Sequence, residues 1–390
     1  MKSLIFIYFI IIMVKTTSAQ VDPETVSKIL KNLSEEYAPD KRTAIFKVDY
    51  SIENSIITFS GETNIPEAKK KLLNSFLQTQ IIDQIHLLPS KELGDRVYGI
   101  VNLSVANVRT KPSHSAELAT QVMLGTQLRI LKSEGEWYLV QGEDDYIGWL
   151  DDDGVCVMNK EQFQNWIYNE KVIITVPFEF VYTKPSLLSA TLSDIVIGNL
   201  LLRKSEVDGF TEVEFPDGRI GYINSQCSEN YQSWLHNRSA DFANIYRAAQ
   251  KMMGIPYLWG GTSIKGLDCS GFTKLVFQLN GILLPRDASQ QVHVGEPVDT
   301  ENGFENLLPG DLLFFGYKDP VSMNERITHV AIYIGNLDFL HSSGRVRLNS
   351  LDKSKSYFAE DRLKTFIRAK RILSSIGTNG VKSIKELSNN

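Results

Sequence analysis

The stretch "GLDCSGFTKLVFQLNG" at residues 266–281 contains one of the three cysteines of this 390-residue chain. Apolar residues recur after the cysteine at helical spacing and precede a glycine suited to end a helix. These apolar residues are Phe272, Leu275, Val276 and Leu279, and the glycine is Gly281. Cys269 therefore lies in or just before the first turn of a predicted helix. The unpaired N–H groups and partial positive charge there favour a thiolate with a lowered pKa, and the same N–H groups suit an oxyanion.

A thiolate nucleophile requires a base, and the chain offers six histidines. Among them, His329 lies in a strand-like run of strong alternation, "ITHVAIYIG". Alternation predicts its side chain on the same face as Ile327, Ala331 and Tyr333. The chain then turns at "GNLD" and returns through "FLHSSG", which predicts His341 beside His329 on the neighbouring strand. We expect His329 to act as the general base and His341 to orient it.

Other interpretations of these residues stay open at this point. A lone histidine on a strand is more often structural than catalytic, and a cysteine at a helix start is structural about as often as catalytic. Cys269, His329 and His341 also make a conceivable set of zinc ligands, but the chain has no CxxC or HxxxH spacing in support. Asp268 is well suited to cap the helix that follows it. The order of cysteine, strand histidine and second histidine favours nucleophilic catalysis, and we predict no metal and no cofactor.

Two consecutive segments of the chain repeat each other without a gap at an offset of 73 residues. "VRTKPS" at 108–113 matches "VYTKPS" at 181–186, and "IGWL" at 147–150 matches "IGYI" at 220–223. Both segments consist of short runs rich in β-branched and aromatic residues, which are broken by proline, glycine and Asp-Gly. This pattern is typical of two small all-β barrels in tandem.

The remaining segments predict two mixed regions and a tail. Residues 42–89 have the pattern of two strands, a helix and an apolar strand, which is a small α+β unit with no evident chemistry. Residues 241–254 have apolar residues at helical spacing and end on a glycine, and "NLLPGDLLFFG" and "RITHVAIYIGN" have the pattern of strands. After Leu373 the hydrophobic periodicity is lost, which predicts a loose tail.

The N-terminus has the order of a secretory signal. Lys2 precedes an apolar run from Leu4 to Val14, and small residues follow at Thr17 and Ala19. We expect cleavage after Ala19 and an exported protein, periplasmic or extracellular. No later run is long enough for a transmembrane helix, so we expect no membrane span once the signal is removed; an uncleaved anchor is the alternative. A formal net charge of −5 argues against a nucleic-acid partner.

An oxidising compartment raises the question of a disulfide. Cys156 and Cys227 follow the ends of the two repeats. Their pairing stays an alternative, because equivalent edges of two barrels need not be adjacent. Cys269 is left over in either case, and an odd thiol in an exported protein is a candidate reactive one.

Residues from about 241 to 373 resemble the NlpC-type cell-wall peptidases, a branch of the papain-like cysteine peptidases. The resemblance rests on five motifs that occur in the same order. They are "GIPYLWGGTSIKGLDCSGF", "LPRDASQQ", "LLPGDLLFF", "THVAIYIG" and "FLHSSG". The repeats at about 97–230 resemble bacterial SH3-like domains, so the whole chain resembles the three-module γ-D-glutamyl-L-diamino-acid endopeptidases that act on cell-wall peptides.

The resemblance implies an α+β fold. A papain-like, NlpC-type catalytic domain is preceded by two small all-β SH3-like barrels and a small N-terminal α+β unit. The expected boundaries are a signal peptide at 1–19, the N-terminal unit at 20–95, SH3-like domains at 96–158 and 159–230, the peptidase domain at 231–373 and a flexible tail at 374–390. We expect a monomer.

The resemblance also assigns catalytic roles to individual residues. Cys269 is the expected nucleophile, His329 the base and His341 the polar third residue. Tyr257 and Trp259 are expected to line the active-site groove, with the tyrosine near the oxyanion. Simple core aromatics are the alternative for these two residues.

Substrate-binding roles follow from the same resemblance. Asp268, Ser270 and Asp287 are expected to contact the substrate, and Asp287 to bind the free amine of an N-terminal L-alanine. A cap for the helix after it is the alternative for Asp287. A tyrosine and a glutamate of the first SH3-like domain complete the amine pocket in the family. We assign these to Tyr146 and Glu117, because the second repeat carries different residues at the same offsets.

The implied activity is hydrolysis of the amide between γ-D-glutamate and a diamino acid in the stem peptides of peptidoglycan. An amine pocket implies a preference for fragments with a free N-terminal L-alanine, as in cell-wall peptide recycling or scavenging. The alternative is an endopeptidase that acts on intact peptidoglycan and uses the SH3-like domains as wall-binding modules. A non-catalytic binding protein on this fold is expected to lack the cysteine or a histidine, and all three are present.

Overall fold

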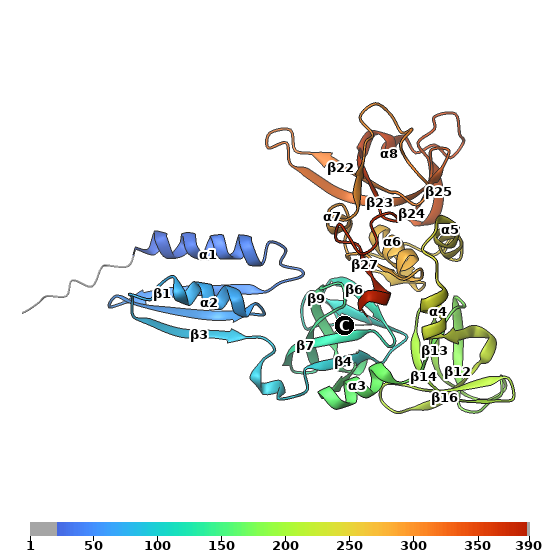
Figure 1. Ribbon diagram of the computed structural model, residues 1–390, viewed down its shortest axis with the longest axis horizontal. Helices are drawn as coiled ribbons and strands as arrows, with labels where there is room; N and C mark the ends of the chain where they lie inside the picture. The colour runs from blue at the N-terminus through green and yellow to red at the C-terminus, as the bar shows by residue number, and fades with distance from the viewer. Residues whose placement is uncertain (1–21, 388–390) are drawn as a thin grey trace, which may run out of the picture. The chain divides into compact units, whose positions relative to one another are not determined.

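The computed structural model of the protein describes residues 22–387, which are divided into two compact units between Leu88 and Pro89. The predicted signal peptide at 1–19 lies outside the described residues. The division falls before the predicted boundary at 95, because the segment after Pro89 attaches to the second unit. There the N–H of Ser90 donates a hydrogen bond to the carbonyl of Leu131. In Figure 1 the first unit is blue and the second runs from cyan to red.

The first unit is a small α+β structure, as predicted. Its strands are β1 (Phe46–Glu53), β2 (Ile56–Thr63) and β3 (Ile81–Leu87), and its helices are α1 (Pro23–Tyr37) and α2 (Pro66–Asn74). β1 and β2 are antiparallel, whereas β3 runs parallel to β2 after the connection through α2. The helices place Val26, Leu33 and Leu72 in one apolar cluster with Ile57 and Phe59 of β2. The prediction for this region omitted α1.

The two repeats each fold into a seven-stranded sheet with the same strand order. The first barrel comprises η1 (Lys91–Leu93), β4 (Tyr98–Val101), β5 (Val105–Arg109), β6 (Leu118–Met123), β7 (Gln127–Glu134), β8 (Trp137–Gln141), β9 (Ile147–Asp151), η2 (Asp152–Gly154) and β10 (Val155–Met158). The second barrel comprises β11 (Lys171–Ile174), β12 (Phe178–Tyr182), β13 (Thr191–Val196), β14 (Leu200–Val207), β15 (Phe210–Glu214), β16 (Ile220–Asn224), η3 (Ser225–Cys227) and β17 (Ser228–Asn230). β4 to β9 correspond residue for residue to β11 to β16 at the offset of 73, which confirms the internal repeat.

Each barrel has its own core, and this decides the question of the disulfide. All three cysteines are free thiols. Cys156 lies on β10 and packs with Trp166 of α3 (Lys160–Tyr168), whereas Cys227 is buried in the core of the second barrel. The alternative of a bond between Cys156 and Cys227 is therefore wrong, because the two sulfur atoms belong to separate clusters.

The C-terminal domain is built around a six-stranded antiparallel sheet with the order β21-β26-β22-β23-β24-β25. The strands of this sheet are β21 (Glu296–Val298), β22 (Leu312–Lys318), β23 (Glu325–Gly335), β24 (Asp338–Ser343), β25 (Arg345–Ser350) and β26 (Phe366–Arg371). The other elements are α4 (Tyr231–Asn237), α5 (Phe242–Gln250), β18 (Thr262–Ser263), β19 (Gly266–Leu267), α6 (Cys269–Gln278), β20 (Ile282–Leu283), α7 (Ala288–Gln291) and α8 (Glu360–Thr365). α5 and α6 share a core with one face of the sheet, and α6 contacts β23 and β24 (Figure 1).

A β-bulge in β23 changes which side chains share a face near the predicted base. β22 and β23 shift register between the pairs Phe315–His329 and Gly316–Ile327, so Thr328 is the extra residue. Ile327 consequently packs against the cluster of α5 and α6. The ring of His329 instead lies 5.8 Å from that of Phe315, which belongs to the cluster on the other face. The prediction that Ile327 and His329 share a face is wrong, because the bulge interrupts the alternation.

The described residues after Leu373 do not form a loose tail. β27 (Lys382–Ser383) pairs antiparallel with β20, and α9 (Ile384–Leu387) follows it. Val381 is 2% exposed and belongs to the core cluster of the C-terminal domain. The prediction of a flexible tail at 374–390 is therefore wrong for residues 374–387. A short segment with no periodicity is held in place by pairing with the edge of another strand and by one buried side chain.

Candidate active site

Cys269 is the first residue of α6, as predicted. The carboxylate of Asp268 caps the helix by accepting a 2.7 Å hydrogen bond from the N–H of Gly271. A glycine is required at this position, because a Cβ on Gly271 would lie 2.0 Å from the carbonyl oxygen of Gly261. The first turn of α6 and the loop at 256–261 are therefore in close contact.

The protonation state of Cys269 differs from the prediction. Cys269 is 7% exposed. Burial, followed by the carboxylate of Asp268, raises the pKa of its thiol to about 11. The N–H groups of Val330 and Ser270 and the guanidinium of Arg286 act in the opposite direction with smaller effect on this pKa. The predicted thiolate is therefore wrong for the free protein, since the cost of burying a charge exceeds the help from the helix N-terminus.

The thiol lies against β23, at the residue that follows His329. The backbone N–H of Val330, the residue after His329, hydrogen bonds the sulfur of Cys269. Val330 and Cys269 also share the same core cluster. Tyr257, from the loop at 256–261, is close enough for Cys269 to raise the pKa of its phenol, after the larger effect of burial. The phenol therefore stays protonated next to the thiol and can donate a hydrogen bond.

His329 and His341 form a directly hydrogen-bonded pair on neighbouring strands, as predicted. Nε2 of His329 lies 2.8 Å from Nδ1 of His341, and the two rings meet edge to face at 86°. Nε2 of His341 in turn lies 3.0 Å from Oδ1 of Asn349 on β25. The exposed fractions of His329 and His341 are 6% and 1%. The second histidine therefore limits the rotation of the first.

Both imidazoles are neutral near neutral pH. Burial, followed by Arg362, lowers the pKa of His329 well below its usual value. Burial likewise lowers the pKa of His341 to about 4, although the hydrogen bond to Asn349 opposes this shift. A neutral imidazole and a neutral thiol are the protonation states from which a general base can accept the proton of a cysteine.

A buried ion pair supports the start of α6. The side chain of Arg286 is fully buried. It donates two hydrogen bonds to the carboxylate of Asp268, from Nη2 at 2.6 Å and from Nη1 at 3.2 Å. Asp268 also accepts from the N–H of Gly260 at 3.0 Å and from the hydroxyl of Ser270 at 3.2 Å. Nε of Arg286 donates to the hydroxyl of Thr120 in the first barrel at 2.8 Å. Asp268 and Ser270 thus hold in place the helix that begins with Cys269, and their contact with substrate stays a prediction.

The first barrel contributes two of the predicted pocket residues to this region. The indole Nε1 of Trp259 donates a 2.8 Å hydrogen bond to Oε1 of Glu117. The phenol of Tyr146 donates a 3.2 Å hydrogen bond to Oδ2 of Asp287. The structure therefore places these four side chains, from two different domains, in two hydrogen-bonded pairs.

The structure also decides between the alternative roles of Trp259 and Asp287. Trp259 is 64% exposed, so the alternative of a core aromatic is wrong for it. Asp287 is the N-cap of α7 and forms a capping box with Gln290, which is the alternative role expected for it. The same carboxylate also accepts the hydrogen bond of Tyr146, so Asp287 contacts the first barrel as well as capping α7.

Three charged or polar residues of the site were not predicted. Arg286 stands directly before Asp287 in "LPRDASQQ", and an arginine next to three apolar residues is a signal for a buried ion pair. Asn349 on β25 and Arg362 on α8 lie outside the sequence motifs, and no regular spacing connects them with the residues of those motifs. They reach the histidine pair through the folding of the sheet and of the loop after it.

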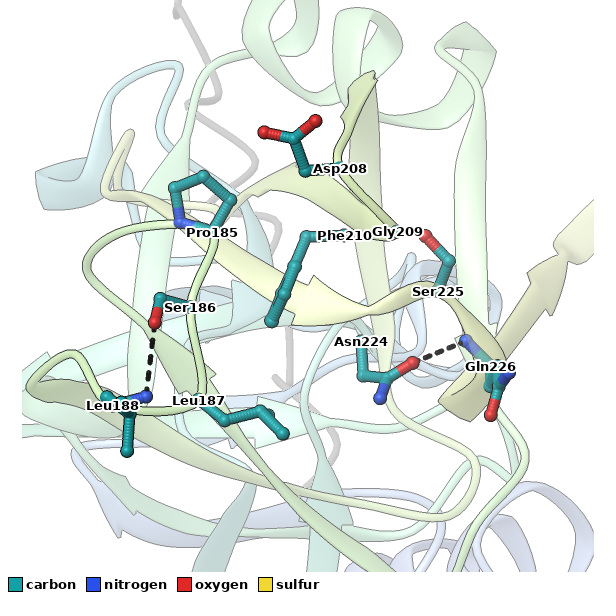
Figure 2. Close-up of a pocket in the computed structure, with 10 residues that line it drawn as sticks. All are labelled: Pro185, Ser186, Leu187, Leu188, Asp208, Gly209, Phe210, Asn224, Ser225 and Gln226. Atoms are coloured by element: carbon teal, nitrogen blue, oxygen red, sulfur yellow. Dashed lines mark hydrogen bonds between the residues drawn. The ribbon is translucent and has the colours of Figure 1, made fainter.

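The second barrel carries a separate open depression, away from these residues. Figure 2 shows the ring of Phe210 between the loop of Leu187 and Leu188 and the segment that ends β16. Leu187 and Leu188 are 57% and 97% exposed. An apolar surface of this kind on a small barrel is suited to contact a partner.

No group of three or more histidine, cysteine, aspartate or glutamate side chains within residues 22–387 is arranged to hold a metal ion. Over the same range, every helix is too short or too polar to cross a membrane.

Known families and proteins match both parts of the second unit. Residues 254–366 match the model of the NlpC/P60 family, and residues 108–155 match that of the bacterial dipeptidyl-peptidase SH3 domain. The chain is 29% identical to dipeptidyl-peptidase 6 of Lysinibacillus sphaericus, over 69% of this chain and 97% of that protein. It is 28% identical to the γ-D-glutamyl-L-lysine dipeptidyl-peptidase of Bacillus cereus, over 59% of this chain and 68% of that protein. It is 32% identical to a probable endopeptidase NlpC homolog of Haemophilus influenzae, over 39% of this chain and 79% of that protein.

A solved structure shows the same fold. The crystal structure of an NlpC/P60 family protein from Bacillus cereus superposes with a TM-score of 0.60 at 24% identity, and the match covers 71% of this chain and 99% of that chain. This likeness confirms the predicted α+β fold, in which SH3-like barrels precede an NlpC-type domain.

Proposed function

Because the chain belongs to the NlpC/P60 family of cysteine peptidases, we propose that it hydrolyses the amide between γ-D-glutamate and the following diamino acid in peptidoglycan stem peptides. We further propose that it prefers fragments with a free N-terminal L-alanine and serves cell-wall peptide recycling or scavenging. The name of the relative from Bacillus cereus, a γ-D-glutamyl-L-lysine dipeptidyl-peptidase, supports the choice of bond. The name of the relative from Lysinibacillus sphaericus supports the removal of a dipeptide.

The contact between the first barrel and the C-terminal domain carries the proposed preference. Tyr146 and Glu117 of the barrel hydrogen bond Asp287 and Trp259, and we propose that the two carboxylates of Asp287 and Glu117 line one groove. Nη1 of Arg286 is 3.8 Å from Oδ1 of Asp287 and balances part of its charge. The negative charge that remains attracts an ammonium group and gains nothing from an acylated nitrogen. A dipeptide end with a free amine is therefore the proposed occupant, and the barrel closes the groove beyond it.

The chemistry follows from the protonation states of the free protein. His329 accepts the proton of the Cys269 thiol while the sulfur attacks the γ-carbonyl carbon. The oxyanion receives hydrogen bonds from the phenol of Tyr257 and from N–H groups at the start of α6. The C–N bond then breaks as His329 gives its proton to the leaving amine, and a thioester remains on Cys269. Water, deprotonated by His329, attacks the thioester, and the sulfur leaves and regains a proton.

Digestion of defined tripeptides tests this proposal. The substrate is L-Ala-γ-D-Glu-diamino acid with a free or an acetylated N-terminus, and mass spectrometry follows the products with and without Cys269→Ala. We expect rapid release of the diamino acid from the free peptide and about 100-fold slower release from the acetylated one, which loses charge-assisted contacts. Equal cleavage of both peptides contradicts the amine pocket. Full activity of the Cys269→Ala variant contradicts the mechanism.

A second candidate function is cleavage of intact peptidoglycan with the barrels as wall-binding modules. The observation in its favour is the open depression of the second barrel with its exposed Leu187 and Leu188. Incubation of purified sacculi with the protein and with the Cys269→Ala variant separates the candidates. Sedimentation of the inactive variant with sacculi, together with peptide release by the active protein, favours this second function.

Export and a monomeric state belong to the same proposal. Cleavage after Ala19 is expected from the order of charge, apolar run and small residues at the N-terminus. Intact-mass measurement of the protein recovered from the medium or periplasm tests the cleavage site. Sedimentation velocity tests the monomer.

A further inference from the structure

A chain of hydrogen bonds continues from the histidine pair to the loop after β25. Nε2 of His329 is 2.8 Å from Nδ1 of His341, and Nε2 of His341 is 3.0 Å from Oδ1 of Asn349. Nδ2 of Asn349 donates a 2.8 Å hydrogen bond to the carbonyl oxygen of Tyr357. The N–H of Ser350 donates to the same oxygen at 3.2 Å, which holds that acceptor beside β25.

The last acceptor sets the direction of the whole chain. A carbonyl oxygen can only accept, so the amide nitrogen of Asn349 faces Tyr357 and its oxygen faces His341. Since that oxygen also accepts, Nε2 of a neutral His341 carries the proton and its Nδ1 does not. Nδ1 of His341 then accepts from the protonated Nε2 of His329. Nδ1 of His329 is left unprotonated, which is the nitrogen a general base needs.

We propose that Asn349 is a positioning residue that holds His341 and His329 in these tautomers, so that Nδ1 of His329 is the base for Cys269. The inference rests on the proposed function, in which His329 is the base, and deepens it. Asn349 acts through His341 and is not itself assigned to the reacting atoms.

The charged groups around the two histidines keep both rings neutral, so hydrogen bonds decide which tautomer each ring adopts. Arg347 on β25 and Arg362 and Asp361 on α8 face His341, and His329 lies across from it on β23. The two arginines oppose a positive charge on either ring and so keep the pair neutral. In a neutral pair each ring has one N–H, and the neighbouring acceptor decides which nitrogen carries it.

A purely structural role for Asn349 makes a different prediction. In that case the residue only ties the loop at 352–358 to β25 through its amide N–H group. Asn349→Asp separates the two roles, because a carboxylate keeps the acceptor for His341 and loses the donor to Tyr357. Asn349→Ala removes both groups. Tyr357→Phe is the loop control, since it removes a 3.3 Å hydrogen bond to Asp338 and leaves the tautomer chain unchanged.

Kinetics of these three variants on the free tripeptide give the first test, with exposed Asn302→Ala as the matched asparagine control. We expect Asn349→Ala to lower kcat about 10- to 100-fold, less than the roughly 10²- to 10⁴-fold that full loss of general-base catalysis costs, with KM changed less than about twofold. Asn349→Asp should keep kcat within about threefold and move the acid limb of its pH profile upward, because a carboxylate favours the protonated imidazole. Tyr357→Phe and Asn302→Ala should match the parent protein.

The tautomers give a second test that does not depend on the substrate. Two-bond 15N–1H correlation spectra of the Cys269→Ala protein, labelled at histidine nitrogens, should show Nε2 protonated in both His329 and His341. Asn349→Ala in this background should produce a mixture of tautomers, and Asn349→Asp should not. Thermal unfolding of each variant shows whether it is folded.

Either of two results overturns the inference. One is a parent protein in which Nδ1 of His341 or of His329 carries the proton. The other is an Asn349→Asp variant that matches Asn349→Ala in kcat and in tautomers, which leaves the loop contact as the role of Asn349. Failure of the parent protein to cleave any tripeptide contradicts the proposed function instead, and the tautomer spectra still decide the role of Asn349.

Discussion

The phenol of Tyr146 and the carboxylate of Asp287 belong to two different domains and share a 3.2 Å hydrogen bond. Near this contact, Lys274 of α6 forms a buried ion pair with Asp144 of the first barrel. The helix that begins with Cys269 is therefore tied directly to the barrel that supplies Tyr146. A barrel held in this way is positioned to shape the proposed peptide groove, and its removal is expected to change which peptide end is accepted.

Replacement of Asp287 by Asn should remove the preference for a free amine. The side chain keeps its shape and loses its charge, so kcat/KM for the free tripeptide should fall about 10- to 100-fold, as for a lost hydrogen bond to a charged group. The slow rate on the acetylated tripeptide should stay the same. Asp299→Asn, at an exposed position in the same domain, is the control. An equal fall on both peptides would assign Asp287 to capping of α7 alone.

Replacement of Arg286 by Met should destabilise the fold. Asp268 would be left buried without its partner, and loss of one member of a buried pair costs about 3–5 kcal/mol of unfolding free energy. Urea unfolding measures the change. Arg219→Met is the matched control, because its ion pair with Asp217 has side chains that are 36% and 31% exposed and is worth less than about 1 kcal/mol. Similar losses in the two variants would contradict the importance of burial.

Alkylation of Cys269 should report its raised pKa. With a thiol pKa of about 11, the thiolate fraction grows about tenfold for each pH unit between pH 7 and 9. The rate of iodoacetamide labelling at Cys269, followed on its own peptide by mass spectrometry, should rise in proportion. A short cysteine peptide is the reference, and its rate should level off near its pKa of about 8.5. A labelling rate at Cys269 that does not change with pH would instead indicate that the thiolate is already formed at about pH 7.

Removal of the charge of Arg362 should move the pH profile. Burial and then Arg362 lower the pKa of His329, and this histidine must be unprotonated to act as base. Without the positive charge protonation becomes easier, so the pKa of His329 rises and the acid limb of kcat/KM moves to higher pH. Arg362→Gln tests this against Arg345→Gln, an exposed arginine on β25. An unchanged limb in Arg362→Gln would remove Arg362 from the electrostatics of the site.

Shortening the side chain of Val381 should weaken the C-terminal domain. Val381 is 2% exposed in the main core cluster, so loss of two methyl groups is expected to cost about 2 kcal/mol of unfolding free energy. Lys385→Ala, on the exposed side of the same segment, should change the unfolding free energy by less than about 0.5 kcal/mol. Stability of Val381→Ala equal to that of the parent would mean that the segment is loosely attached in solution.

The residues predicted well from sequence are those whose signal is local. The apolar spacing after Cys269 placed the start of α6, because a helix is specified by its own turns and cap. Alternation and a short turn placed His341 beside His329. The divergence of Tyr146 and Glu117 between the two repeats singled them out, and both contact the C-terminal domain.

Sequence alone thus determined the internal repeat, the start of α6 at Cys269 and the pairing of His329 with His341, since periodicity, caps and turn residues act between near neighbours. Only the tertiary structure decided the protonation of Cys269, the side of β23 on which Ile327 lies, the docking of Val381 and the place of Asn349 at the end of the histidine chain. These properties depend on burial and on contacts between distant segments. Burial sets the pKa, and a single extra residue in a strand reverses its faces, so neither follows from the local pattern.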